Sequence, residues 1–141
     1  MNIFYHFERE ITNLLEKFES QKLTRQAWTH EAHLTVGFCY IFQNSEQKAI
    51  ELMRAGVQKF NDSVGIINSD SSGYHETITL AWIRVLAKFN QKHRLPLLES
   101  VNLLLNSLES DRKYLLEFYS QELLFSVRAR KEWTEADLMF F

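Results

Sequence analysis

The segment 28-WTHEAHLTVGFCYIF-42 decides the fold class, because it is apolar around most of the circumference that a helix of this sequence would have. A second segment, 74-YHETITLAWIRVLAKFNQ-91, has the same character. A helix that is apolar on nearly all sides is stable only when other helices surround it. We therefore expect these two segments to form the central pair of helices in an all-α bundle.

The remaining segments predict amphipathic helices around that pair. Apolar residues between positions 3 and 18 recur every three or four residues, which is the spacing of one helix face. Ser45 is a predicted N-cap for a third helix, and Pro96 is expected to open a fifth. Three further caps are expected to begin short C-terminal helices: Ser110, Ser120 and Thr134. The prediction is a single helical domain over residues 1–141, with about five main helices and a short-helical tail.

Composition excludes several classes of partner. Sixteen basic and eighteen acidic residues nearly cancel, which argues against a nucleic-acid-binding face. No apolar run approaches the ~20 residues that a bilayer-spanning helix needs, and the amphipathic N-terminus does not resemble a signal peptide. A single cysteine, Cys39, cannot form an internal disulfide and is typical of a reducing compartment. We expect a cytoplasmic protein without nucleic-acid or membrane partners.

Three histidines lie on the apolar faces of the two central segments. With 100° per residue, His30 and His33 share one helix face with Leu34 and Ile41. His75 likewise lies on the core-facing side of the second segment. All three are expected to point inward, and they would meet if the two helices begin at the same end of the bundle.

One interpretation of this cluster is a metal site. Histidines at i and i+3 place two imidazoles one turn apart, and a third from a facing helix would leave one coordination position for water. Zinc, iron, nickel or manganese would suit such ligands. Glu31 and Glu76 adjoin the histidines in sequence. Each is a candidate for accepting a hydrogen bond from a metal-bound histidine or for acting as a general base. This interpretation predicts metal-assisted hydrolysis, or a related reaction, of an unknown small molecule.

Two other interpretations need no metal. In the first, the histidines line a pocket that binds a small molecule, together with Trp28, Tyr74, Thr79, Arg128 and Arg130. In the second, they are structural residues whose hydrogen bonds satisfy the core. The chain would then act as an interaction module, with a homodimer as its expected assembly, because its aromatic residues exceed the needs of a small core.

The C-terminal segment adds candidates to the same region. Arg128 and Arg130, near Trp133, are expected to close over the pocket and to pair with Glu76 or with an anionic substrate. Asp137 is a candidate carboxylate ligand for a metal. The alternative is a capping tail with surface charges and one anchoring tryptophan.

The two motifs together, WTHEAHL from Trp28 to Leu34 and GYHET from Gly73 to Thr77, resemble a family of small bacterial all-helical proteins of unassigned function. The later FYS, AR, W and DL elements are similar too, although Ala136 stands where the family pattern has proline. This resemblance implies that the motifs belong together and implies no reaction. The expected topology is also similar to helical bundles of the DinB type, which bind metal through three histidines.

Overall fold

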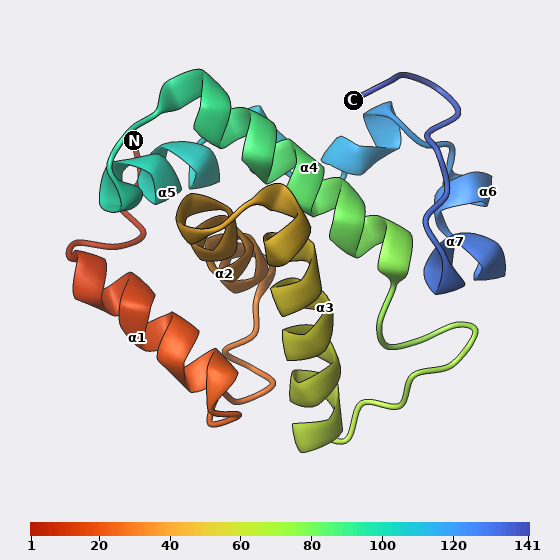
Figure 1. Cartoon of the computed structure of the whole chain (residues 1–141), viewed down its shortest axis with the longest axis horizontal. Coiled ribbons are helices and arrows are strands. Elements are labelled where there is room, and N and C mark those ends of the chain that lie inside the picture. Colours follow the sequence, from red (N-terminus) through yellow and green to blue (C-terminus); the bar gives the residue numbers. More distant parts are fainter.

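The computed structural model describes all 141 residues as a bundle of helices without β-strands. Five α-helices of nine to eighteen residues form its body, and short helical turns follow them (Figure 1). This confirms the predicted fold class. The elements are α1 (Glu8–Glu19), α2 (His30–Gln43), α3 (Glu46–Ser63), α4 (Glu76–His93), α5 (Leu97–Leu105), η1 (Leu108–Ser110), η2 (Tyr114–Glu117), α6 (Gln121–Leu124) and α7 (Val127–Lys131).

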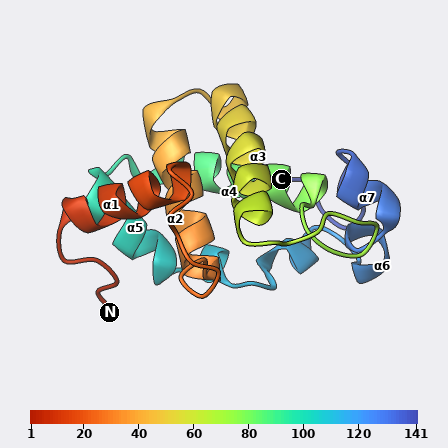
Figure 2. The same ribbon diagram turned by 90° about the horizontal axis from the view of Figure 1, so that it is seen from below.

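Helices α2 and α4 are the central pair that the sequence predicts. Every residue of α2 from Leu34 to Ile41 is buried, and α2 contacts α1, α3, α4 and α5. Helix α4 packs against α2 and α3 and against the C-terminal helix α7 as well. Figures 1 and 2 place α1 and α5 at one end of the molecule and α6 and α7 at the other, so α4 joins two regions.

Hydrophobic side chains form two clusters, one on each side of α4. The larger cluster is built from α1 to α5 and contains fully buried residues such as Phe18, Phe38 and Phe60. The smaller one packs Leu115, Tyr119 and other C-terminal side chains against α4. None of the helices combines the length and the hydrophobicity needed to cross a membrane.

Serine and threonine side chains define the starts of several helices. The hydroxyl of Thr29 accepts a hydrogen bond from the backbone N–H of Ala32 and caps α2. Ser45 caps α3 in the same way, and Ser120 caps α6, as the sequence predicts. Each such cap satisfies an N–H group that has no partner inside the helix.

The N-terminal prediction is wrong in its boundary. Helix α1 begins at Glu8, whereas the apolar spacing predicted a helix from about residue 3. The side chain of Asn102 accepts hydrogen bonds from the backbone N–H groups of Phe4 and Tyr5, at 2.8 and 3.2 Å. The amide nitrogen of Asn102 also donates to the carbonyl of Tyr5 at 2.9 Å, which takes the acceptor that a first helical turn would have used, so the segment stays irregular.

The C-terminal helices also differ from the prediction. Ser110 donates its hydroxyl to backbone carbonyls and starts no α-helix, so only the 3₁₀ turn η2 follows it. Ser126 introduces a separate helix, α7, within the segment that Ser120 was expected to cap as a whole. Thr134 starts no helix, because its carbonyl, which would accept the first helical hydrogen bond, accepts one from the hydroxyl of Tyr119 at 2.7 Å.

Candidate functional site

A pocket of about 490 Å³ lies between the first turns of α2 and α4, with α3 and the C-terminal segment completing its walls. Its volume is in the range of small-molecule sites. More than half of the lining residues are hydrophobic, including Leu34 of α2 and both Met53 and Val57 of α3. All three histidines singled out in the sequence line this one pocket.

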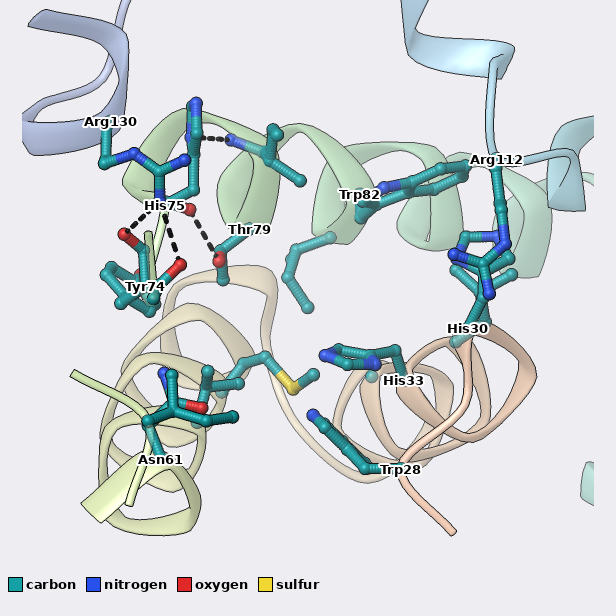
Figure 3. A pocket seen from close by; sticks show the side chains of 18 of the residues that line it. Trp28, His30, His33, Asn61, Tyr74, His75, Thr79, Trp82, Arg112 and Arg130 are labelled. Atoms are coloured by element: carbon teal, nitrogen blue, oxygen red, sulfur yellow. Dashed lines mark hydrogen bonds between the residues drawn. The ribbon is translucent and has the colours of Figure 1, made fainter. Parts of the chain in front are cut away.

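The polar side chains lie on opposite sides of the pocket (Figure 3). Tyr74, His75, Thr79 and Arg130 gather at one edge, where the loop before α4 meets α7. Trp28, His30, His33 and Arg112 lie at the other edge, around the start of α2. The three imidazoles therefore share a pocket without meeting at one point.

His75 uses both of its ring nitrogens inside the protein. It is the N-cap of α4, where its Nδ1 accepts a hydrogen bond from the N–H of Ile78 at 3.1 Å. Its Nε2 donates to the carbonyl of Leu124, at 2.7 Å. Burial lowers the pKa of His75, which favours the neutral ring. His75 therefore fixes the start of α4 to the end of α6 and presents no free lone pair to the pocket.

Glu76, the expected base, is held in an ion pair outside the pocket. Arg54 of α3 donates to both carboxylate oxygens, from Nε at 3.0 Å and from Nη2 at 2.7 Å, and the Tyr74 hydroxyl adds a third bond at 2.6 Å. Burial opposes ionisation of this carboxyl, but the three donors outweigh burial and keep its pKa below the usual value. The side chain is thus a fixed anion that ties α4 to α3.

Thr77 completes the tightly bonded region around GYHET. Its side chain is fully buried, and its hydroxyl donates to the carbonyl of Glu132 at 2.8 Å. The same oxygen accepts from the N–H of Thr134 at 3.1 Å. Because these partners come from the C-terminal segment, the motif anchors that segment to α4.

His33 has a different environment. Its Nδ1 lies 3.1 Å from the carbonyl of Thr29, which can only accept, so the proton sits on Nδ1. Its Nε2 makes no hydrogen bond within the chain and is open to solvent, and Figure 3 shows the ring extending toward the open centre of the pocket. Burial lowers the pKa of His33 to about 4, so the ring is neutral at physiological pH. The pocket therefore contains one neutral imidazole with a free acceptor nitrogen.

The neighbours of His33 hold it in this orientation. The indole of Trp28 packs on the imidazole with ring centroids 3.8 Å apart, and Phe18 stacks on that indole at 4.5 Å. His30, one turn earlier, donates from Nε2 to the carbonyl of Ser110 at 2.7 Å and meets Trp82 edge-on. The Nδ1 of His30 is the second imidazole nitrogen of α2 without a partner in the chain.

Three polar or aromatic side chains are among the pocket residues that sequence reasoning did not assign to a site. Asn61 is 5% exposed and follows Met53 and Val57 at intervals of four residues on α3. A single amide on an otherwise apolar helix face could have indicated a polar group in the pocket. Trp82 lies on α4, one turn after Thr79 and Ile78. Arg112 comes from the turn between η1 and η2, and nothing in the sequence near it pointed to the pocket.

The other predicted residues divide into two groups. Trp28, Tyr74, Thr79 and Arg130 line the pocket. The remaining four lie elsewhere: Glu31 is exposed on the first turn of α2, Glu76 pairs with Arg54, Arg128 pairs with Glu132, and Asp137 accepts a bond from the N–H of Ser120. The expected pairing of a C-terminal arginine with Glu76 is therefore wrong, because Arg54 of α3 pairs with that carboxylate and Arg130 donates to backbone carbonyls instead.

The positions of the three histidines do not form the three-ligand metal centre that the sequence predicted. No group of three His, Cys, Asp or Glu side chains is close enough to hold a metal ion in this arrangement. His75 would first have to break two hydrogen bonds to turn a lone pair toward a metal. Metal binding therefore stays a prediction, and its most accessible nitrogens are the free ones of His30 and His33.

Comparison with known proteins adds no assignment. The chain matches no protein-family model, no curated protein and no solved structure. The resemblance seen in the WTHEAHL and GYHET motifs therefore stays a prediction, and the function has to be argued from the pocket.

Proposed function

We propose that the pocket between α2 and α4 binds a small organic molecule without a metal. The observation that carries this proposal is the neutral imidazole of His33, whose Nε2 accepts no hydrogen bond from the chain and faces a cavity of about 490 Å³. This nitrogen is open to solvent, and a ligand N–H or O–H group could replace water as its donor. The hydrophobic walls supply most of the contact area, as in typical ligand pockets.

Two more polar groups in the pocket have hydrogen-bonding capacity to spare. The indole N–H of Trp28 makes no hydrogen bond within the chain, and Asn61 uses only its amide nitrogen, on Asn68 at 3.4 Å. The ligand would donate to His33, accept from Trp28 and place its apolar body against Met53. Each such hydrogen bond contributes about 1 kcal/mol of binding free energy, so burial of the apolar body supplies the larger share.

The role of the GYHET motif in this proposal is to position the walls. His75 and Glu76 fix the start of α4 to α6 and α3, and Thr77 fixes the C-terminal segment from which Arg130 enters the pocket. A rigid wall lowers the cost of ordering the site when the ligand binds. None of these bonds has to change for a ligand to enter.

The test uses N-phenyl-1-naphthylamine, a neutral fluorescent probe with an N–H donor and an apolar body. We expect saturable binding to the wild-type protein, and a loss of at least about tenfold in affinity for Thr79→Phe, whose added ring would occupy the pocket. Thr12→Phe on α1 is the matched control, because Thr12 also donates its hydroxyl to a backbone carbonyl and lies outside the pocket. Equal binding by the wild-type protein and by Thr79→Phe would contradict the proposal.

A second candidate function, metal binding, is favoured by one observation. His30 and His33 each keep one unpartnered nitrogen, on residues one helical turn apart. We propose that a divalent ion such as zinc or nickel, if it binds, uses these two nitrogens and completes its coordination with water or substrate. Calorimetric titration with zinc should then lose its signal in His33→Ala and keep it in His75→Asn. Absence of any stoichiometric signal in the wild-type protein would reject this candidate.

Two further proposals concern the cellular compartment and the oligomeric state. Cys39 is buried and free, and burial holds the pKa of its thiol far above the usual value, so it behaves as an inert side chain suited to the reducing cytoplasm. Exposed apolar residues near the C-terminus, among them Leu138 and Phe140, support a homodimer as the assembly to test. A monomeric mass over a wide concentration range in light scattering would reject the dimer.

A further inference from the structure

The charges that line the pocket are all of one sign. Arg112 and Arg130 are among its residues, and no aspartate or glutamate is. The imidazoles of His33 and His75 add no charge to the pocket, because burial lowers their pKa and keeps both rings neutral at physiological pH. A pocket with two guanidinium groups and no carboxylate is therefore found in a chain whose net charge is −2.

The acidic side chains around Arg130 pair with other cations, whereas Glu109 and Asp111, which precede Arg112 in the sequence, lie outside the pocket and form no ion pair. Glu76 pairs with Arg54, Glu132 pairs with Arg128, and Asp70 pairs with Lys131. Neither Arg112 nor Arg130 takes part in an ion pair. The two pocket arginines are therefore without a counter-charge at ion-pair distance, Arg112 as an exposed side chain and Arg130 as a half-buried one.

The two arginines differ in how they are held. Arg130 donates from Nη1 to the carbonyls of Gly73 and Tyr74, at 2.9 and 3.3 Å, which fixes its guanidinium at the edge of the pocket. Arg112 makes no hydrogen bond through its side chain, and Figure 3 places it beside His30 at the opposite edge. Its donors are free to meet an anion, and a guanidinium binds carboxylate and phosphate oxygens with two parallel hydrogen bonds.

The ends of two helices add to the positive potential. Helix α2 begins at His30, and α4 begins directly after His75, so both N-termini lie at the pocket wall. An N-terminus carries a partial positive charge that favours anions within about one turn. This contribution supports the argument from the arginines, which stands without it.

We propose that the ligand of this pocket is an organic anion, with a carboxylate or phosphate group at the guanidinium of Arg112 and an apolar body between α2, α3 and α4. This inference rests on the proposed small-molecule function and specifies the chemical class of the ligand. A donor group on the body would meet the Nε2 of His33, so the anion and the donor are recognised at neighbouring points of the same edge. The fixed charge of Arg130 adds to the field that attracts the ligand.

The experiment compares two fluorescent probes that differ by one anionic group. One is the neutral N-phenyl-1-naphthylamine, and the other is 8-anilinonaphthalene-1-sulfonate, which carries a sulfonate on the same skeleton. Both are titrated into the wild-type protein, Arg112→Gln and the control Arg25→Gln, an exposed arginine that does not line the pocket. We expect Arg112→Gln to weaken the anionic probe roughly threefold to tenfold and to leave the neutral probe unchanged, because one charge-assisted contact is lost.

The outcomes separate the two proposals. If Arg112→Gln leaves the ratio of the two affinities unchanged, or if Arg25→Gln changes it as much, the anion inference is overturned while binding of the neutral probe still supports the pocket. If neither probe binds to the wild-type protein, both proposals are overturned. Displacement of the anionic probe by octanoate, octyl phosphate and octanol then identifies the head group, and equal displacement by octanol would also overturn the inference.

Discussion

The two histidine motifs look alike in sequence and differ in what the structure does with them. In 73-GYHET-77 the imidazole of His75 and the side chains of Glu76 and Thr77 are all bonded to other parts of the chain. In 28-WTHEAHL-34 both histidines donate one hydrogen bond to a carbonyl and keep their second nitrogen free at the pocket. The first motif bonds α4 to α3 and to the C-terminal segment, and the second supplies groups that make no further hydrogen bond within the chain and are open to solvent or a ligand.

The difference comes from what surrounds each helix start. The start of α4 lies against the C-terminal segment, whose carbonyls at Leu124 and Glu132 accept hydrogen bonds from the motif. The start of α2 faces the cavity, where no backbone comes close enough to pair with the Nε2 of His33. A histidine beside a glutamate therefore indicates a helix start here, and its packing partners decide whether it is structural or free to bind.

The largest expected effect is the loss of His75. His75→Ala removes the cap of α4 and leaves the buried carbonyl of Leu124 without its donor, so we expect a loss of about 3 kcal/mol in the free energy of unfolding. His75→Asn, which keeps a capping side chain, should recover about 1 kcal/mol. Denaturant unfolding followed by circular dichroism measures both. A loss below about 0.5 kcal/mol for the alanine variant would mean that the motif is not structural.

The second prediction concerns pH and His33. Its pKa is about 4 in the folded protein and near its ordinary value of 6.5 when unfolded. Between these values the unfolded chain takes up a proton that the folded protein does not, so stability falls as the pH drops below 6.5. From pH 7 to pH 5 this group removes about 2 kcal/mol of stability.

The check is the pH dependence of unfolding in His33→Gln. Between pH 7 and pH 5 the free energy of unfolding of the variant should fall by about 2 kcal/mol less than that of the wild-type protein. The other titrating groups are the same in both proteins, so their contributions cancel when the two curves are subtracted. His6→Gln, a change of an exposed histidine outside the pocket, should follow the wild-type curve. Parallel curves for His33→Gln and the wild-type protein would show that His33 does not carry the depressed pKa.

The third prediction tests the ion pair of the structural motif. Glu76→Gln weakens two hydrogen bonds from Arg54 and should cost about 1–2 kcal/mol of stability, since this carboxylate side chain is only 16% exposed. Glu132→Gln is the matched control, because its pair with Arg128 is exposed on both sides and should contribute about 0.5 kcal/mol or less. An equal loss of stability for the two substitutions would show that the pair of Glu76 with Arg54 contributes no more than an exposed ion pair.

The smallest expected effect is that of His33→Gln on stability at neutral pH. The substitution removes one hydrogen bond to Thr29 and a stacking contact with Trp28, so we expect a cost below about 1 kcal/mol at pH 7. Affinity for the neutral probe should nevertheless fall severalfold. A large loss of stability together with unchanged binding would reverse the roles that we assign to the two motifs.

Much of the fold was predictable from local chemistry. The apolar circumference of the segment from Trp28 to Phe42 places it at the centre, and Ser45 and Ser120 cap the helices that they precede. The boundaries at the termini were not predictable, because long-range bonds decide them. Asn102 donates to the carbonyl of Tyr5, and the hydroxyl of Tyr119 donates to the carbonyl of Thr134 that would have accepted the first bond of a helix.

The site was predictable only in part. Helical geometry predicted that His30 and His33 face inward, but their sharing of one pocket with His75 depends on α2 and α4 beginning at the same end of the bundle, which the sequence left open. The partners of each imidazole come from distant carbonyls at Ser110 and Leu124, which no local pattern shows. Those partners decide the tautomer and the free nitrogen of each ring, and with them the chemistry of the site.

Nitrogen NMR of the imidazole rings tests the central claim most directly. Long-range ¹H–¹⁵N correlation at pH 7 should show His33 as the neutral Nδ1–H tautomer and His75 as the neutral Nε2–H tautomer. Addition of the neutral probe should shift the Nε2 resonance of His33 and leave the ring of His75 unchanged. A protonated His33, or a probe that shifts His75 and not His33, would contradict the assignment of the two motifs to binding and to structure.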